Sequence, residues 1–97
     1  MPGYVMLARW TDQGVRAVAD LPRRLDDAKR MLAEMGGEFS SLHATMGEYD
    51  LVGIYTAPDD AVALRFTMML QRLGNARTTS MKAFPEPALR EIVKSIG

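Results

Sequence analysis

Two short segments of this sequence carry apolar side chains at successive positions, where a half-exposed strand would alternate apolar with polar ones. The segments are residues 4–10 (YVMLARW) and 49–57 (YDLVGIYTA). In a strand, Val5 and Leu7 oppose Met6, Ala8 and Trp10 on the first segment, and Val52 and Ile54 oppose Leu51 and Tyr55 on the second. Helices can cover only one face of a sheet built from such strands, so the second apolar face needs a cover of its own.

The rest of the chain shows the patterns of two long helices and two more strands. Residues 11–35 are helical in pattern with a restart at Pro22, and Gly36-Gly37 ends this helix. Pro58-Asp59-Asp60 begins a second helix, because acidic side chains suit the positive end of a helix dipole. Residues 38–46 and 76–84 have strand patterns, and a short helix extends to about residue 96.

This order predicts an α+β fold, namely a ferredoxin-like βαββαβ sandwich with a four-stranded antiparallel sheet. Two helices cover one face, the strand order is 4-1-3-2, and a short C-terminal helix follows. The length of 97 residues predicts one domain over residues 1–97. A homodimer or higher oligomer through the open sheet face would bury the uncovered apolar surface. The alternative is that the C-terminal helix folds back over this face.

Charge and composition narrow the range of partners. Lys and Arg balance Asp and Glu at 12 each, and Arg23-Arg24 lies beside Asp26-Asp27 as a solvated helix face, so nucleic acid is not an expected partner. The absence of Cys excludes disulfides, and a single His leaves no ligand spacing typical of a metal site. We expect no metal and no cofactor. No apolar run reaches the roughly 18–20 residues of a spanning helix and no signal peptide is evident, so we expect no membrane partner and a cytoplasmic location.

Several separated motifs resemble the GYD domain family. The segment from Thr45 to Asp50 (TMGEYD), followed by an apolar strand and Ala57-Pro58-Asp59-Asp60, is similar to the turn that gives this family its name. The opening strand with residues 10–14 (WTDQG) and the closing residues 73–79 (LGNARTT) also resemble the family, so the resemblance covers nearly the whole chain. It implies a ferredoxin-like subunit, similar to dimeric α/β barrel proteins and paired through its sheet, without a defined biochemical function.

A weaker likeness is to the ligand-sensing domains of leucine-responsive regulators. It is carried by residues 47–52 (GEYDLV) and 74–78 (GNART). This likeness implies a small-metabolite site at a subunit interface, in a chain that lacks the DNA-binding half of such regulators.

Candidate catalytic residues lie around the predicted hairpin. A two-residue turn at Gly47-Glu48 would place Thr45 opposite Asp50 and His43 opposite Val52. His43 and Asp50 would then be diagonal neighbours on one face, about 7–8 Å apart at Cα. An aspartate there can orient an imidazole for general acid–base catalysis, which makes His43 and Asp50 the catalytic candidates. The alternative is that Asp50 satisfies the hairpin backbone or Thr45, and that His43 is structural.

Arg77 is the candidate for holding a small anionic metabolite, because a guanidinium binds a carboxylate through two hydrogen bonds. The alternative is that it pairs with an internal acid such as Asp50 or Glu48. Tyr49, Trp10 and Thr45 complete the candidate ligand-binding set, with core packing as the alternative role of the two aromatic rings.

Three functions fit these observations. The first is a homo-oligomeric small-molecule-binding or interaction module. The second is a small cofactor-independent enzyme of dimeric α/β barrel type that uses His43, Asp50 and Arg77. The third is a purely structural subunit, which predicts that the chain has no polar pocket.

Overall fold

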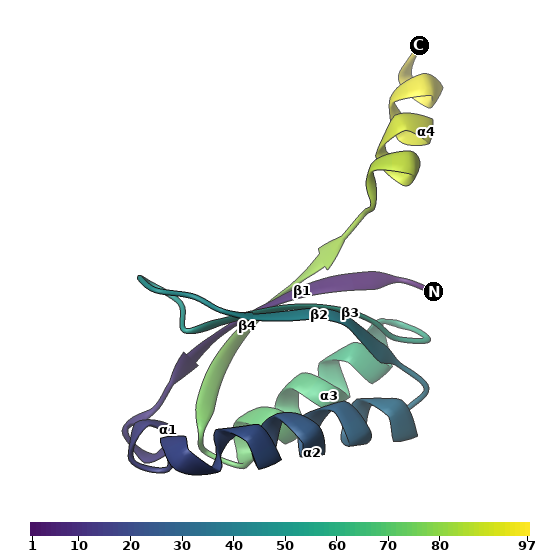
Figure 1. Ribbon diagram of the computed structural model, residues 1–97. Coiled ribbons are helices and arrows are strands. Elements are labelled where there is room, and N and C mark those ends of the chain that lie inside the picture. The colour runs from purple at the N-terminus through teal and green to yellow at the C-terminus, as the bar shows by residue number, and fades with distance from the viewer.

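A computed structural model describes residues 1–97 and contains one antiparallel sheet with two long helices against one of its faces (Figure 1). The strands are β1 (Gly3–Trp10), β2 (Glu38–Ala44), β3 (Leu51–Thr56) and β4 (Ala76–Ala83). The helices are α1 (Asp12–Arg16), the 3₁₀ turn η1 (Val18–Asp20), α2 (Leu21–Glu34), α3 (Asp60–Arg72) and α4 (Glu86–Ile96). The strand order β2-β3-β1-β4, with every neighbouring pair antiparallel, confirms the ferredoxin-like α+β fold.

Side chains at the helix starts fix where α1 and α3 begin. Thr11 Oγ1 accepts a hydrogen bond from Gly14 N at 3.1 Å, and Asp59 Oδ1 accepts one from Val62 N at 2.9 Å. Each bond satisfies a backbone donor that the first turn of a helix leaves free. Pro22 lies in the first turn of α2, so the helical stretch predicted for residues 11–35 is divided into α1, η1 and α2.

An aromatic cluster forms the centre of the core between the sheet and the helices. Tyr55, Phe66 and Leu32 are fully buried. The rings of Tyr4 and Tyr55 are stacked with centroids 5.2 Å apart, and the rings of Phe39 and Phe66 each lie 5.5 Å from Tyr55. Such contacts add to the stability gained from burying the apolar area, so this cluster holds β1, β2 and β3 against α3.

The opposite sheet face is apolar at its centre and has no helix over it. Val5 lies between Ile54 and Met81 across the two neighbouring strands, and Leu7 lies opposite Val52. Ile54 and Met81 are 44% and 48% exposed. The sequence-based prediction of two apolar faces on the central strands is therefore confirmed.

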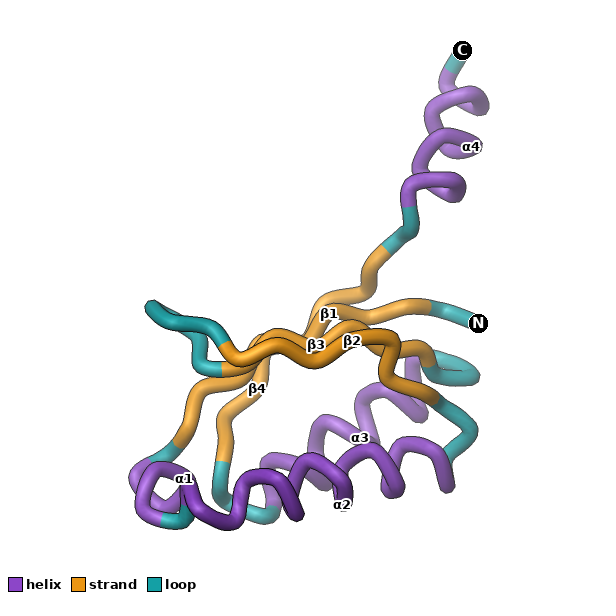
Figure 2. Tube along the Cα trace, in the orientation of Figure 1, coloured by secondary structure: helices purple, strands orange, loops and turns teal.

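Helix α4 does not cover this face. Figures 1 and 2 show that it leaves the end of β4 on the side opposite α2 and α3, and that it points away from the sheet. The molecule is consequently elongated, with extents of 52 × 31 × 18 Å. The alternative in which the C-terminal helix folds back is wrong, because residues 84–86 direct the chain outward rather than back across the strands.

A hydrogen-bonded triad links β1, α3 and β4 at one end of the sheet. Tyr4 Oη donates to Asp60 Oδ1 at 2.6 Å, and Lys82 Nζ lies 3.2 Å from the same oxygen. Burial of the phenol, followed by its bond to Asp60, raises the pKa of Tyr4 to about 12. The same hydrogen bond and the Lys82 ammonium lower the pKa of Asp60.

The raised pKa of Tyr4 predicts a loss of stability at alkaline pH. Between about pH 10 and pH 12 the unfolded chain releases the phenolic proton while the folded chain keeps it, so the free energy of unfolding falls as the pH rises through this interval. A Tyr4→Phe variant has no such proton. Urea denaturation from pH 9 to pH 12 should show a steeper loss for the wild type than for Tyr4→Phe, and equal slopes would contradict the assignment.

Candidate functional site

The connection between β2 and β3 spans residues 45–50, so the two-residue turn predicted at Gly47-Glu48 is wrong. The predicted register is confirmed, since His43 lies opposite Val52 and Thr45 N donates to the carbonyl of Asp50 at 2.9 Å. Thr45 Oγ1 donates to the carbonyl of Tyr49 at 2.6 Å. This side-chain bond takes the place of a strand hydrogen bond and widens the turn into a loop.

The two catalytic candidates do not contact each other in the chain. Asp50 Oδ2 accepts a hydrogen bond from Trp10 N at 2.9 Å, and Asp50 N donates to the carbonyl of Ala8 at 2.8 Å. The carboxylate therefore extends the β1–β3 ladder by one rung. His43 is exposed and forms no side-chain hydrogen bond or ion pair. Asp50 therefore bonds to backbone groups, as the alternative to a catalytic role expects. These groups belong to β1 rather than to the hairpin.

Arg77 and Tyr49 lie on or near the open face, near Arg9. Arg77 is exposed opposite Arg9, and neither Asp50 nor Glu48 pairs with it. Glu48 pairs instead with Arg9, whose guanidinium lies 4.9 Å from the ring centroid of Tyr49.

His43 and Arg77 belong to opposite edges of the sheet. They lie on β2 and β4, three strand spacings apart, which amounts to about 14 Å or more. One chain therefore does not bring His43, Asp50 and Arg77 together.

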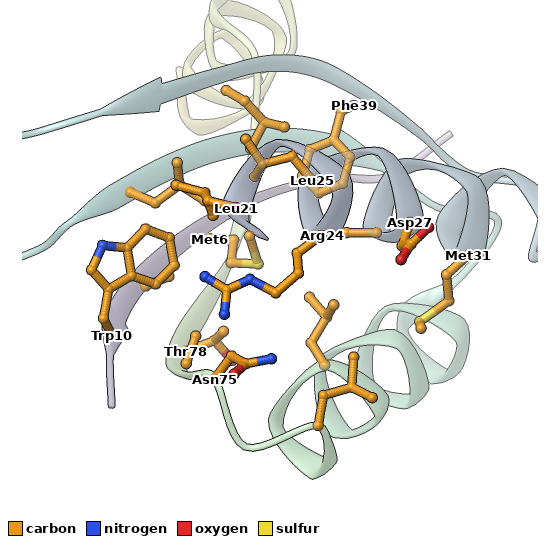
Figure 3. Close-up of a pocket in the computed structure, with 17 residues that line it drawn as sticks. Met6, Trp10, Leu21, Arg24, Leu25, Asp27, Met31, Phe39, Asn75 and Thr78 are labelled. Carbon is orange, nitrogen blue, oxygen red and sulfur yellow. The ribbon is translucent and has the colours of Figure 1, made fainter. Parts of the chain in front are cut away.

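A cavity of about 120 Å³ lies on the other side of the sheet, under α2 (Figure 3). It is lined by 17 residues, of which 13 are hydrophobic, from β1, β2, β3, α2, the end of α3 and the start of β4. Of the six candidates, Trp10 lines this cavity. The other five candidates, His43, Thr45, Tyr49, Asp50 and Arg77, do not line it.

Two polar groups in the cavity are buried and have no partner. They are Nη1 of Arg24 and Oγ1 of Thr78. The other terminal nitrogen of Arg24 reaches only a long contact of 3.4 Å with the carbonyl of Gly14. Figure 3 shows the guanidinium turned inward from α2, toward Thr78 and Asn75.

The carboxylate that also lines the cavity is occupied elsewhere. Asp27 accepts from Arg23 at 3.2 Å and from Arg30 at 3.1 Å, and it does not pair with Arg24. Arg24 is therefore the one cation of the cavity wall, and no carboxylate lies within salt-bridge distance of it.

The sequence-based interpretation of Arg23-Arg24 as a solvated pair is wrong for Arg24. The neighbouring Arg23 is exposed and pairs with Asp20 and Asp27, as a solvated side chain does. The spacing of Leu21, Arg24, Leu25 and Ala28 is the signal that identifies the inward residue, because positions three and four apart share a helix face.

Hydrogen bonds between distant segments position Asn75, which lines one side of the cavity. Thr11 Oγ1 donates to the carbonyl of Gly74 at 2.6 Å, and Thr11 N donates to the carbonyl of Asn75 at 3.2 Å. Gln13 Nε2 donates to Asn75 Oδ1 at 3.0 Å. A Cβ at Gly14 would lie 2.0 Å from the carbonyl oxygen of Asn75, so this close approach requires glycine. The turn after β1 and the loop before β4 are therefore held together as one unit.

A four-stranded antiparallel sheet with two helices on one face and an open apolar second face defines the chain as a ferredoxin-like α+β fold. The GYD domain family matches residues 4–93, which is nearly the whole chain. The protein belongs to the GYD domain family.

Comparisons with individual proteins agree with this fold. A glutamine synthetase and cystathionine beta-lyase binding protein of Thermus thermophilus is 28% identical over 86 residues, which is 88% of this chain and 90% of that protein. The crystal structure of FFRP-DM1 matches with a TM-score of 0.62 at 15% identity, over 87% of this chain and all of the other. The crystal structure of TTHA0845, also from Thermus thermophilus, matches with a TM-score of 0.56 at 20% identity, over 88% and 95% of the two chains.

The structure has no group of three or more His, Asp or Glu side chains that could hold a metal ion. Its helices are all too short or too polar to cross a membrane.

The unpaired donor of Arg24 predicts that this residue lowers stability. A buried donor without a partner costs about 1–3 kcal/mol. An Arg24→Met variant keeps an apolar stem in the cavity and removes the donor, so the free energy of unfolding should rise by about 1 kcal/mol. Urea denaturation measures this. Arg23→Met is the matched control and should not gain stability, because Arg23 is exposed and forms only surface ion pairs. A loss of stability in Arg24→Met would show that the guanidinium has a structural role.

Proposed function

We propose that this protein is a homo-oligomeric interaction module, a dimer paired through its open sheet faces that binds another protein. The observation that carries the self-association is the uncovered apolar centre of the sheet, formed by β1, β3 and β4. Apolar patches of a few hundred Å² on a monomer typically mark interfaces. Face-to-face packing of two copies would bury this patch on both subunits at once.

The distribution of polar residues on the open face supports an interface there. Val5, Leu7 and Val52 are half-buried at its centre, while the charged Arg9 and Arg77 lie at one end. An apolar centre with a polar border is the usual composition of a protein interface. In this proposal Arg77 belongs to the border of the dimer.

The direction of α4 supports a second copy as the occupant of this face. The helix projects on the side of the sheet where a facing subunit would lie (Figure 1). Its apolar residues are 45–80% exposed and have no partner within the chain: Leu89, Ile92, Val93 and Ile96. In a face-to-face dimer each α4 would pack along the other subunit and cover these residues.

The Thermus thermophilus relative supports the second half of the proposal, namely that the dimer binds another protein. That protein is described as binding glutamine synthetase and cystathionine beta-lyase, and it is matched over nine-tenths of its own length. We infer that the dimer of this chain likewise binds an enzyme. The enzyme hypothesis that rests on His43, Asp50 and Arg77 has no assembled set of residues in its support.

Disruption of the open face should yield a monomer. In Ile54→Arg a two-fold interface would receive two buried charges without partners, so the dissociation constant should rise about hundredfold or more. Size-exclusion chromatography with light scattering should give twice the mass of one chain for the wild type and the mass of one chain for Ile54→Arg.

The matched control is Met68→Arg, at an exposed apolar residue on the outer side of α3. It should leave the mass at that of the dimer. Ile92→Arg tests the projecting helix α4, and should weaken the dimer without changing the sheet. A wild type that stays monomeric at high concentration would overturn the proposal.

Binding to an enzyme is tested with purified partners. Immobilised wild-type protein should bind glutamine synthetase or cystathionine beta-lyase of its own organism in biolayer interferometry, and an unrelated enzyme of similar size serves as the control. If neither enzyme binds while the wild type is a dimer, the partner part of the proposal fails and the self-association stands.

A further inference from the structure

We propose that the cavity under α2 is a ligand site for a small monocarboxylate with a compact apolar body. This inference rests on the inner side of the sheet and does not depend on the proposed function, whose surfaces lie on the opposite side. It makes Arg24 and Thr78 the ligand-binding residues.

The size and lining of the cavity set the apolar part of the ligand. An engineered apolar cavity of about 150 Å³ takes up benzene. A cavity of about 120 Å³ therefore suits a branched four- to five-carbon chain or a ring of similar bulk. Thirteen hydrophobic lining residues provide the contacts for such a body, among them Met6, Leu25 and Leu70.

The unpaired polar groups in the cavity determine the polar group that a ligand should carry. Arg24 Nη1 and Thr78 Oγ1 are buried without partners, and both can donate a hydrogen bond. A carboxylate accepts from a guanidinium and from a hydroxyl, so one carboxylate would satisfy both groups. A neutral amide could not compensate the charge of Arg24.

The polar groups that line the cavity argue against an amino acid as the ligand. An α-ammonium group requires a carboxylate or a set of free carbonyl oxygens. Asp27, the acid of the cavity wall, is held by Arg23 and Arg30. A monocarboxylate without an amino group is therefore the class that the cavity fits.

The orientation of Arg24 separates a ligand site from ordinary packing. Arginine side chains at a surface usually extend their heads to water along an apolar stem. Arg23, one residue earlier, is 67% exposed in its side chain and does so. The guanidinium of Arg24 instead points inward (Figure 3), where Nη1 has no hydrogen-bond acceptor from the protein.

Isothermal titration of the full chain tests the ligand class. The probes are 4-methylpentanoate and benzoate, each compared with its neutral amide, 4-methylpentanamide or benzamide. At least one acid should bind, and its amide should bind about tenfold more weakly or not at all, because a hydrogen bond to a charged group is lost.

Variants test the residues. Arg24→Met and Thr78→Val should weaken the acid, with the larger loss, about tenfold or more, in Arg24→Met. Arg23→Met is the matched control and should bind as the wild type does. Since Arg24→Met is expected to be at least as stable as the wild type, a loss of binding does not reflect unfolding, and its thermal melting curve verifies this.

Three results would overturn the inference. They are no binding of either acid at millimolar concentration, equal binding of acid and amide, and unchanged binding in Arg24→Met. Ile54→Arg should retain acid binding even as a monomer, because the cavity lies within one chain. The experiments can therefore disprove the proposed ligand site and the proposed dimer independently of each other.

Discussion

The antiparallel pairing of β1 with β3 is the constraint on which the rest of the molecule depends. Both strands are central in the sheet, and both present apolar side chains to its two sides. On one side Tyr4, Met6 and Tyr55 pack into the core beneath α2 and α3. On the other, Val5 and Ile54 lie opposite each other with no helix over them. The hydrophobic effect is roughly proportional to the apolar area removed from water. Because the helices bury only one face of the sheet, burial of the other face can still stabilise an associated state.

The strand order and the open face were predictable from residue patterns, because hydrophobic periodicity and helix-start signals such as Thr11 and Asp59 are local. The length of the β2–β3 connection was not. It depends on Thr45 Oγ1 bonding to the carbonyl of Tyr49, and on the Asp50 carboxylate turning to Trp10 N. The second of these bonds joins residues 40 positions apart, so it cannot be predicted from the residues of the turn alone.

The residues that line the cavity were likewise only partly predictable from local sequence. For Trp10, a large ring at the end of a strand, the sequence leaves both ligand binding and core packing open, and the structure places it in the cavity lining. The sequence places Arg24 at the surface with Arg23, since both lie near acidic side chains along the chain. Successive helical residues point about 100° apart, so neighbours in sequence can belong to different environments. The role of Thr78 is visible only when β4 is placed beside β1.

Strand β1 has a consequence for how this chain can vary. Its even-numbered residues from Tyr4 to Trp10 face the helices, and Met6, Ala8 and Trp10 among them line the cavity. Its odd-numbered residues Val5 and Leu7 face outward from the same peptide planes. No position in the middle of this strand is a neutral surface position, so nearly every replacement there alters one of the two environments. Substitutions should accordingly be tolerated least along β1, and more readily on the outer side of α3.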